Sequence, residues 1–543
     1  MIKKLYKFLI QEILPLVFIA IAIYLSSRAM FHEGFFRTID DISVVRIHHL
    51  YLEIINFSWD NFPVRLGSYL SHGYGYALYL FYSPLSYYLG AIAMLLGNLS
   101  DIMATKFIYV LPLIFGPLIM YWALRQKING LPAVVGAIIF ALFPFRGFDI
   151  YVRGGIAEAF GTIFIPLTVG GWWLMERHKK AGFYITAIGI FLTIISHNLS
   201  GLLLITLTIV YGIFSKPVKE YWLALLTGIL ASSFYWLPMI YYLPIVKVSY
   251  STQNVASVLT HFVGFNELFN PFRSYQYGGA LHSWFFWLPL FLIFITKFKL
   301  TYEIKKWLTI FIVTYFLMSN FTKPLWELFL PIARMIQFPW RLMIILSTVI
   351  PLIIALTLNQ FRSVKTKILL SIIIVVSLIP YIKSFQPKEY SYFYAYNAED
   401  TGPCATSWGE EYLPIWVYEC INKPPEKDIF MTKPGKFELT QSTQINIQGR
   451  YQSETDNTLM IHRYDFPGWR VLVDGSPVKV DHTFSPAGIM EAYVPAGSHT
   501  FEVSYGKTNI MILSDLISLL TIVSVLLVIT LQLIHYYHSN NRK

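Results

Sequence analysis

The stretch FHEGFFRTIDDISVVRIHHLYLEI, residues 31–54, follows directly on the first hydrophobic segment of the chain. It leads through GYGYALYLFYSPLSYYLG at 73–90 to Ala104. Acids, basic residues, glycines and aromatics therefore stand between two membrane-embedded pieces. A segment that only joined two membrane spans would not need these residue types, so the rest of the chain is interpreted around this one.

The composition indicates whether the chain is suited to water or to a lipid bilayer. It has 55% hydrophobic, 17% aromatic and 13% charged residues, far from the balance of a soluble domain. Apolar runs of the roughly 17–25 residues that cross a bilayer recur along it, with one polar interruption at about 385–508. The net charge of +11 comes from short Lys and Arg clusters between these runs. This pattern is typical of the positive-inside rule, and we expect no nucleic-acid partner.

Charge parity sets the predicted topology. If residues 82–97 crossed the membrane, the later basic clusters would repeatedly fall outside, against the positive-inside rule. If this piece is a re-entrant or surface-lying helix, those clusters share the cytoplasm with both termini. Because no small-residue cleavage site follows the first apolar run, it is interpreted as a retained anchor. The predicted fold class is an α-helical polytopic membrane protein with about twelve transmembrane helices, at 12–30, 105–124, 131–146, 157–176, 182–196, 200–215, 220–243, 283–297, 306–320, 340–358, 367–383 and 510–536.

The first outer loop holds an acid pair and a histidine pair. If 41–53 is helical, Asp41 and His48 lie within about 20° of each other around its axis, two turns apart. His48 and His49 are about 100° apart, so we do not expect them to share one metal ion. Asp40 and Asp41 either cap a helix at the interface or act in catalysis, and their spacing does not decide between the two.

The other outer loops hold ionisable residues at the ends of predicted spans, where charges are costly unless they are paired or hydrated. Arg146, Asp149, Arg153 and Glu158 lie within thirteen residues. Arg153 and Glu158 either form an ion pair that fixes two helices or make a cationic phosphate site with an acid that orients it.

Two further groups have equally open interpretations. His197 and Asn198 either cap backbone groups or act as ligands. In ARMIQFPWRLMI (333–344), Trp340 is interpreted as an interfacial belt residue, which leaves Arg341 and Gln337 as functional candidates.

These residues carry a resemblance. The acid pair, the HH-containing helix, the run at 73–90, RGGIAEAF (153–160), SHN (196–198) and IQFPWR (336–341) resemble a bacterial family of membrane proteins labelled as related to 6-pyruvoyl-tetrahydropterin synthase, beside the YfhO-like proteins. Both resemble the GT-C superfamily of membrane glycosyltransferases. The pterin label implies no pterin chemistry here, because the sequence shows no zinc-binding histidine cluster.

The resemblance implies a transferase that uses a sugar carried on polyprenyl phosphate. By it, Asp40 or Asp41 is the catalytic acid. We add the hypothesis that Arg153, Arg341 or His48 holds the donor phosphate, because these groups can stabilise the negative charge that grows as the bond to the sugar breaks. Glu158, His197, Gln337 and His49 support them. The resemblance further implies a bacterial inner membrane protein acting on a glycan, lipid or protein of the cell envelope.

Three further points concern the metal, the donor and the alternatives to this function. The sequence leaves open whether a divalent ion such as Mg²⁺ or Mn²⁺ takes part. It has no Gly-rich phosphate loop, which favours a lipid-linked donor over a nucleotide sugar. The alternatives are a lipid or polysaccharide transporter or flippase, which should show paired broken helices near the bilayer midplane, and a non-catalytic membrane scaffold.

The polar interruption predicts a separate outer domain. From Lys436 onward, short alternating runs separated by turns at Asp474-Gly475 and Ala496-Gly497 predict an antiparallel β-sandwich. The only two cysteines, Cys404 and Cys420, lie in this domain and are candidates for a disulfide. The predicted domains are a GT-C-like transmembrane region at 1–384, an extracytoplasmic β-sandwich at 385–508, and a last helix with a cytoplasmic tail at 509–543.

Overall fold

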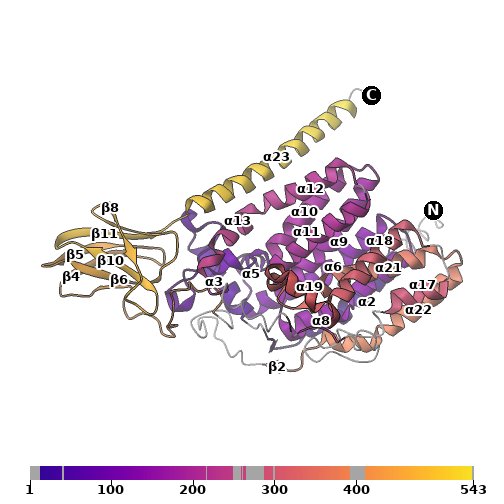
Figure 1. Cartoon of the computed structure of the whole chain (residues 1–543), viewed down its shortest axis with the longest axis horizontal. Coiled ribbons are helices and arrows are strands. Elements are labelled where there is room, and N and C mark those ends of the chain that lie inside the picture. Colours follow the sequence, from indigo (N-terminus) through magenta and orange to yellow (C-terminus); the bar gives the residue numbers. More distant parts are fainter. Residues whose placement is uncertain are drawn as a thin grey trace. The chain divides into compact units, whose positions relative to one another are not determined.

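The computed structural model describes residues 13–39, 42–215, 217–248, 259, 261–264, 287–296, 300–391 and 410–540. The described chain is mostly helical, and its strands are concentrated before the C-terminal helix (Figure 1). Two compact units are formed, each from three separate stretches. Unit 1 comprises 1–41, 105–229 and 252–394, and unit 2 comprises 42–104, 230–251 and 395–543.

Six described helices are long and apolar enough to cross a membrane: 14–31, 101–125, 131–153, 198–215, 339–360 and 509–535. Two pairs of helices, each bent at a short break, raise the number to eight if each pair is one span. The prediction of about twelve spans is thus supported in part. Several predicted spans form shorter helices: α10 has 16 residues, which at 1.5 Å per residue covers about 24 Å of a hydrocarbon core about 30 Å thick.

Unit 1 is a helical body in which glycines allow close packing. In Figure 1, α9 (Ile156–Glu176), α10 (Ala181–Ser196) and α11 (Asn198–Ser215) lie side by side. A Cβ on Gly171 would come within 2.4 Å of Thr186 Oγ1, and one on Gly182 within 2.6 Å of the Met175 nitrogen. Small residues therefore bring the backbones of α9 and α10 together, as at many membrane helix interfaces.

Helix α21 (Met343–Gln360) is buried over almost its whole length by other helices of unit 1. Helix α6 begins in unit 2 and continues into unit 1. The other elements are α2 (Leu14–Ser27), η2 (Arg28–Phe31), α6 (Asp101–Arg125), α7 (Leu131–Ala141), α8 (Pro144–Phe148), η5 (Asp149–Arg153), α12 (Lys219–Ala231), α17 (Leu288–Thr296), α18 (Tyr302–Leu317), η8 (Asn320–Thr322), α19 (Lys323–Leu328), α20 (Leu330–Ile336), η9 (Pro339–Leu342), α22 (Val364–Ser377) and η10 (Ile379–Phe385), with the strand pair β1 (Phe35–Phe36) and β2 (Tyr390–Ser391).

Unit 2 joins the first loop to the strands. Its helical elements are α3 (Ser43–Ile55), η3 (Trp59–Asn61), η4 (Ser71–Gly73), α4 (Leu78–Phe81), α5 (Leu85–Gly97), α13 (Ser233–Tyr242), η6 (Leu243–Ile245) and α23 (Asn509–Asn540). Helix α5 is the piece predicted to be re-entrant or surface-lying, and its 13 residues cover only about 20 Å. Leu66, Ala77 and Phe81 of the first loop share one core with residues of the strands. The sequence did not predict that the first loop and the strands share a core.

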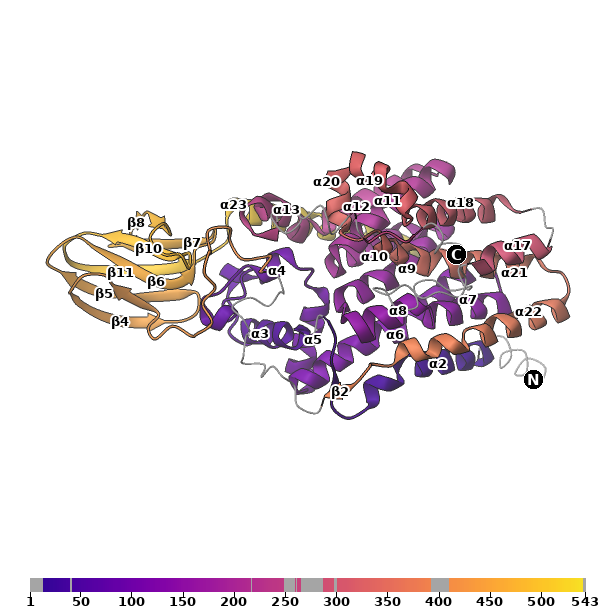
Figure 2. The same ribbon diagram turned by 60° about the horizontal axis from the view of Figure 1, so that its bottom comes forward.

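Among the described residues of unit 2, nine strands form two antiparallel sheets, as the alternating pattern predicts (Figure 2). One sheet has the order β3-β6-β10-β9 and the other β4-β5-β11-β7-β8, and both contribute side chains to the same core. The strands are β3 (Ile429–Met431), β4 (Lys436–Ser442), β5 (Asn446–Ser453), β6 (Asn457–Tyr464), β7 (Trp469–Val473), β8 (Ser476–Val478), β9 (Val480–Asp481), β10 (Ile489–Val494) and β11 (Gly497–Tyr505).

The predicted turn at Asp474-Gly475 is confirmed, and the one predicted at Ala496-Gly497 falls at the connection between β10 and β11. Asp474 and Gly475, with φ of 48° and 77°, connect β7 to β8, and this two-residue geometry favours Asn or Asp followed by Gly. Gly497 begins β11 directly after the second turn. Strand β3 lies before Lys436, where no strand was predicted.

The turn at Asp474 provides a test of pH dependence. A hydrogen bond from His499 Nδ1 (2.5 Å) and then bonds from Thr500 lower the pKa of Asp474 to about 2, and the same Asp474 contact raises the pKa of His499. The lowered carboxyl pKa gives stability that is lost as pH falls from 3.8 toward 2. The raised imidazole pKa gives stability that is complete below 6.5 and lost as pH rises above it.

We therefore expect His499→Ala to lower the melting temperature mainly between pH 4 and 6.5, by about 1–2 °C because the pair is at the surface. Differential scanning fluorimetry of both chains from pH 3 to 9 measures this difference. An equal difference at pH 9 would show that the ion pair is not its cause.

Candidate functional site

A cluster of two acids, two arginines and one histidine lies within unit 1. Arg153 Nη1 is 2.6 Å from Asp149 Oδ1 and 3.1 Å from Glu158 Oε1. The second oxygen of Glu158 is 3.9 Å from His197 Nε2 and 4.0 Å from Arg341 Nε. Three cationic or imidazole groups thus surround one carboxylate. We call these five residues the Glu158 cluster.

The local backbone explains how Asp149, Arg153 and Glu158 meet. Residues 149–153 form η5, a single π-helical turn, a feature often found at functional sites. Gly154 follows in the left-handed conformation with φ of 76°, which a side chain would oppose. Gly155 precedes α9, and Glu158 lies in the first turn of that helix, where the helix dipole stabilises an acid.

His197 connects α10 to α11 and is fixed at its Nδ1 side. The Ser200 backbone N–H donates to His197 Nδ1 at 3.3 Å, and Ser200 Oγ is 2.9 Å from the same nitrogen. A nitrogen that accepts from a backbone N–H carries no proton in the neutral ring, so the proton is assigned to Nε2, on the side of Glu158. The ring therefore caps a helix, as one interpretation held, and also presents a donor to the cluster.

Helix η9 contributes Trp340, which packs against Arg153 of the Glu158 cluster. The Arg153 guanidinium lies 5.0 Å from the centroid of the Trp340 ring, and Trp340 is 5% exposed. Phe145 and Phe148 pack on the same ring. Trp340 is thus a buried platform for Arg153, and its interpretation as an interfacial belt residue was wrong. Stacking on an aromatic face favours Arg over Lys.

Access to the Glu158 cluster is asymmetric. The side chains of Asp149 and Glu158 are 2% exposed, whereas those of Arg153, Arg341 and His197 are 15–18% exposed. No well-aligned hydrogen bond to either oxygen of Glu158 is found within the described part of the chain. An approaching molecule would meet the cationic side, with the acids behind it. Such an arrangement favours an anion that replaces Glu158 as the partner of the arginines.

The other predicted site residues are placed as follows. Asp40, Asp41 and Cys404 lie outside the described residues. Gln337 ends α20 with φ of 63°, a strained conformation for a residue with a side chain. Cys420 is disulfide-bonded. The roles predicted for Asp40, Asp41, Gln337 and Cys404 stay predictions.

His48 and His49 belong to α3 of unit 2. His48 Nδ1 is 3.0 Å from Asp101 Oδ1. His49 is 4% exposed, and burial is the main reason that its pKa falls to about 3, so it is neutral. In the described ranges, no group of three or more His, Cys, Asp or Glu side chains is arranged to hold a metal ion.

The sequence analysis did not select two residues of the Glu158 cluster and its immediate contacts. Asp149 was noted in its loop but was not chosen as a site residue, although an acid four residues before an arginine is a recognised helical pairing signal. Trp340 had no such signal, because its contact with Arg153 depends on how distant helices pack. Arg146, from the same loop, is 2% exposed, and its guanidinium donates hydrogen bonds to Thr162 Oγ1 and the Pro112 carbonyl. These contacts indicate a structural role.

Comparisons with solved structures give a distant similarity. A cryo-EM structure of arabinofuranosyltransferase AftD from Mycobacteria has 14% sequence identity and a TM-score of 0.45, over 69% of this chain and 27% of AftD. A mutant of the same enzyme gives 13% and 0.44, over 69% and 28%. The chain therefore spans little more than a quarter of the length of AftD.

The family comparison is more direct. No curated protein matches the chain. A family model described as a 6-pyruvoyl-tetrahydropterin synthase related domain of membrane proteins matches residues 79–387, more than half of the sequence, and it includes every described member of the Glu158 cluster. The chain belongs to this family of 6-pyruvoyl-tetrahydropterin synthase related membrane proteins.

Proposed function

We propose that this chain is a membrane glycosyltransferase. It moves a sugar from a polyprenyl-phosphate donor to a glycan, lipid or protein acceptor of the cell envelope, on the extracytoplasmic face of a bacterial inner membrane. Both termini are cytoplasmic, and the two sheets form an extracytoplasmic β-sandwich. The proposal combines the resemblance in the sequence motifs with the chemistry of the Glu158 cluster.

The observation that carries the proposal is the accessible cationic side of that cluster. Arg153 and Arg341 both face Glu158, and each is several times more exposed than this acid. A lipid-linked sugar has one phosphate next to the bond that breaks. Two guanidinium groups at the end of helices, in a chain with several membrane spans, suit a phosphate attached to a membrane lipid.

The proposed reaction uses the cluster at the leaving group. The acceptor oxygen bonds to the anomeric carbon, while the bond from that carbon to the phosphate oxygen breaks and releases polyprenyl phosphate. Arg153 and Arg341 stabilise the negative charge that grows on this phosphate. Asp40 or Asp41 takes the proton of the acceptor hydroxyl. Glu158, with His197 Nε2 3.9 Å from one of its oxygens, positions the arginines before the donor binds.

The test compares a deletion strain with the same strain carrying the chain. We expect the deletion to accumulate a polyprenyl-phosphate sugar and to lose one surface glycan, both measured by mass spectrometry. The intact chain should restore the glycan, and Arg341→Ala, inserted at the normal level, should not. An unchanged set of lipid-linked sugars and glycans in the deletion strain would refute the proposal and favour a scaffold.

Gly155→Ala probes the geometry without removing a charge. A Cβ at this position would lie 2.5 Å from Asp149 Oδ1, so the carboxylate must shift away from its contact with Arg153. Misplacement by about 1 Å lowers rates by about 100-fold in other enzymes, and we expect a loss of this order in a transfer assay with purified chain. Gly97→Ala is the control, because its nearest atoms belong to the flexible Leu99 side chain. Equal activity of the two variants would show that the Asp149 contact is not needed.

A further inference from the structure

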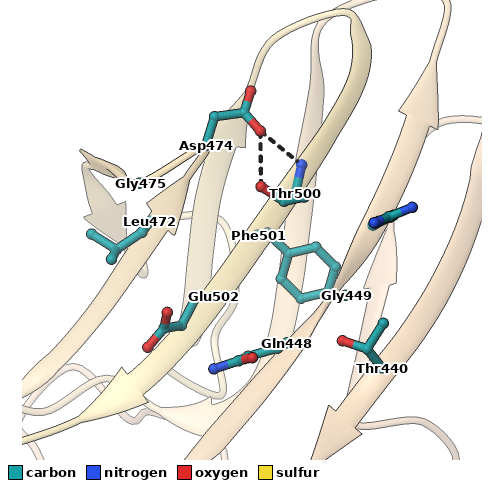
Figure 3. A pocket seen from close by; sticks show the side chains of 10 residues that line it. Thr440, Gln448, Gly449, Leu472, Asp474, Gly475, Thr500, Phe501 and Glu502 are labelled. Carbon is teal, nitrogen blue, oxygen red and sulfur yellow. Dashed lines mark hydrogen bonds between the residues drawn. The ribbon is translucent and has the colours of Figure 1, made fainter.

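The outer face of the five-stranded sheet in unit 2 carries a cavity of about 300 Å³ (Figure 3). Strands β4, β5, β7 and β11 line it, and the turn between β7 and β8 closes one end. The lining residues are Thr440, Gln448, Gly449, Arg450, Leu472, Asp474, Gly475, Thr500, Phe501 and Glu502. Its volume is at the lower end of that of ligand pockets, about 300–1,000 Å³.

The strand register brings the polar groups together. Gln448 and Arg450 are two positions apart on β5, so both point to the same face of the sheet. Glu502 of β11 is the direct cross-strand partner of Gln448. An irregularity in the pairing of β4 with β5 falls at Thr440, and such irregularities redirect side chains. An amide, a guanidinium, a carboxylate and a hydroxyl therefore line one cavity.

These polar groups are not used to hold the sheet together. Within the described residues, the side chains of Gln448, Arg450 and Glu502 make no hydrogen bond or ion pair. The wall beside them is fixed instead, because Asp474 Oδ1 accepts from both the backbone N–H and the hydroxyl of Thr500 at 2.9 Å. Unused donors and acceptors thus face a wall that is already rigid.

Only a small part of the cavity lining is apolar. Gly449, between Gln448 and Arg450 on β5, adds no side chain to the cavity, and the ring of its cross-strand partner Phe501 is buried in the core on the opposite face of the sheet. Leu472, the cross-strand partner of Glu502, adds an aliphatic surface.

The chemistry selects among ligand classes. Two carboxylates, one guanidinium and the His499 ring bound to Asp474 leave the lining without a net positive charge, which disfavours a phosphate or a nucleic acid, and the small extent of the apolar lining disfavours a lipid chain. Planar polar side chains around a small apolar surface suit adjacent hydroxyls above a ring of C–H bonds. We propose that this cavity binds one neutral sugar unit of an envelope glycan. The binding is separate from the Glu158 cluster and does not require the chain to transfer sugars.

The test uses the full chain in detergent with three neutral tetrasaccharides, of glucose, mannose and arabinose, and measures binding by saturation-transfer difference NMR and calorimetry. We expect at least one to bind, and we expect Gln448→Ala and Arg450→Ala each to weaken that binding by about tenfold. Gln452→Ala is the matched control. It is exposed on the same face of β5, two positions beyond Arg450 and outside the cavity.

Each outcome of this experiment either supports or overturns the proposed sugar binding. Binding that is lost in the two variants and kept in Gln452→Ala supports the inference, whether or not transfer is observed. Absence of binding of all three sugars to the unaltered chain overturns it, as does binding that is equal in all variants. Competition by inorganic phosphate would identify an anion site and would also overturn it.

Discussion

Arg153→Ala should lower sugar transfer by about 100- to 1,000-fold, the loss that follows removal of one group stabilising a transition-state charge in other enzymes. Arg153 is the only residue of the Glu158 cluster whose guanidinium contacts both Asp149 and Glu158 in the described chain. It also stacks over Trp340, which fixes its plane. Transfer from a radiolabelled polyprenyl-phosphate sugar by purified chain measures the effect.

Two further variants separate catalysis from folding. Arg153→Ala leaves two buried acids without their shared cation, and this change alone could impair folding. Arg153→Lys keeps the charge but loses the fork and the stacking surface, so we expect a well-folded chain with transfer at least tenfold lower. Arg177→Ala is the control, because Arg177 is exposed and donates to the Gln126 carbonyl. Full transfer by Arg153→Lys would show that the planar guanidinium fork of Arg153 is not needed to position the phosphate.

The sequence predicted the parts of the molecule that depend on local pattern. Alternation from Lys436 onward predicted the strands, and Asp474-Gly475 predicted their tightest turn. RGGIAEAF predicted a glycine-separated Arg and Glu at the start of a helix, and these form an ion pair. Charge parity placed Arg341 on the same side as Arg153, although 187 positions separate them in the numbering.

What the sequence could not predict depends on packing between distant segments. Tyr74 of the first loop stacks on Tyr464 of β6 at 5.5 Å, and Phe81 packs against Phe466. Neither contact has a signature in the local sequence, because an aromatic residue in a loop serves equally at a membrane interface. The first loop was therefore expected to be a part of the membrane region, whereas it shares a core with the sheets.

Another network in unit 1 was not predicted at all. Glu303 Oε1 accepts from the indole N–H groups of Trp173 and Trp307, both at 2.9 Å, and Oε2 is 2.9 Å from Lys306 Nζ. Tyr211 Oη lies 3.0 Å from both Glu303 and Glu176. One hydroxyl has a single proton, so it donates to only one of these carboxylates at a time. The network joins α9, α11 and α18 through one carboxylate.

Glu303→Ala should therefore destabilise the chain by about 3–5 kcal/mol, the cost of breaking a buried ion pair on one side. The change leaves two buried indole N–H groups without their acceptor. It also removes the carboxylate partner of the Lys306 ammonium, which is 4% exposed and keeps only the hydroxyls of Tyr211 and Ser215. Unfolding of purified chain in detergent, followed by the fluorescence of its tryptophans, measures the loss. Glu303→Gln keeps an acceptor oxygen and should lose less, while Glu327→Ala, at an exposed position of α19, should lose almost nothing. If all three variants unfold alike, the carboxylate does not hold these helices together, and the close packing of Trp172, Trp173 and Trp307, each at most 1% exposed, would have to do so alone.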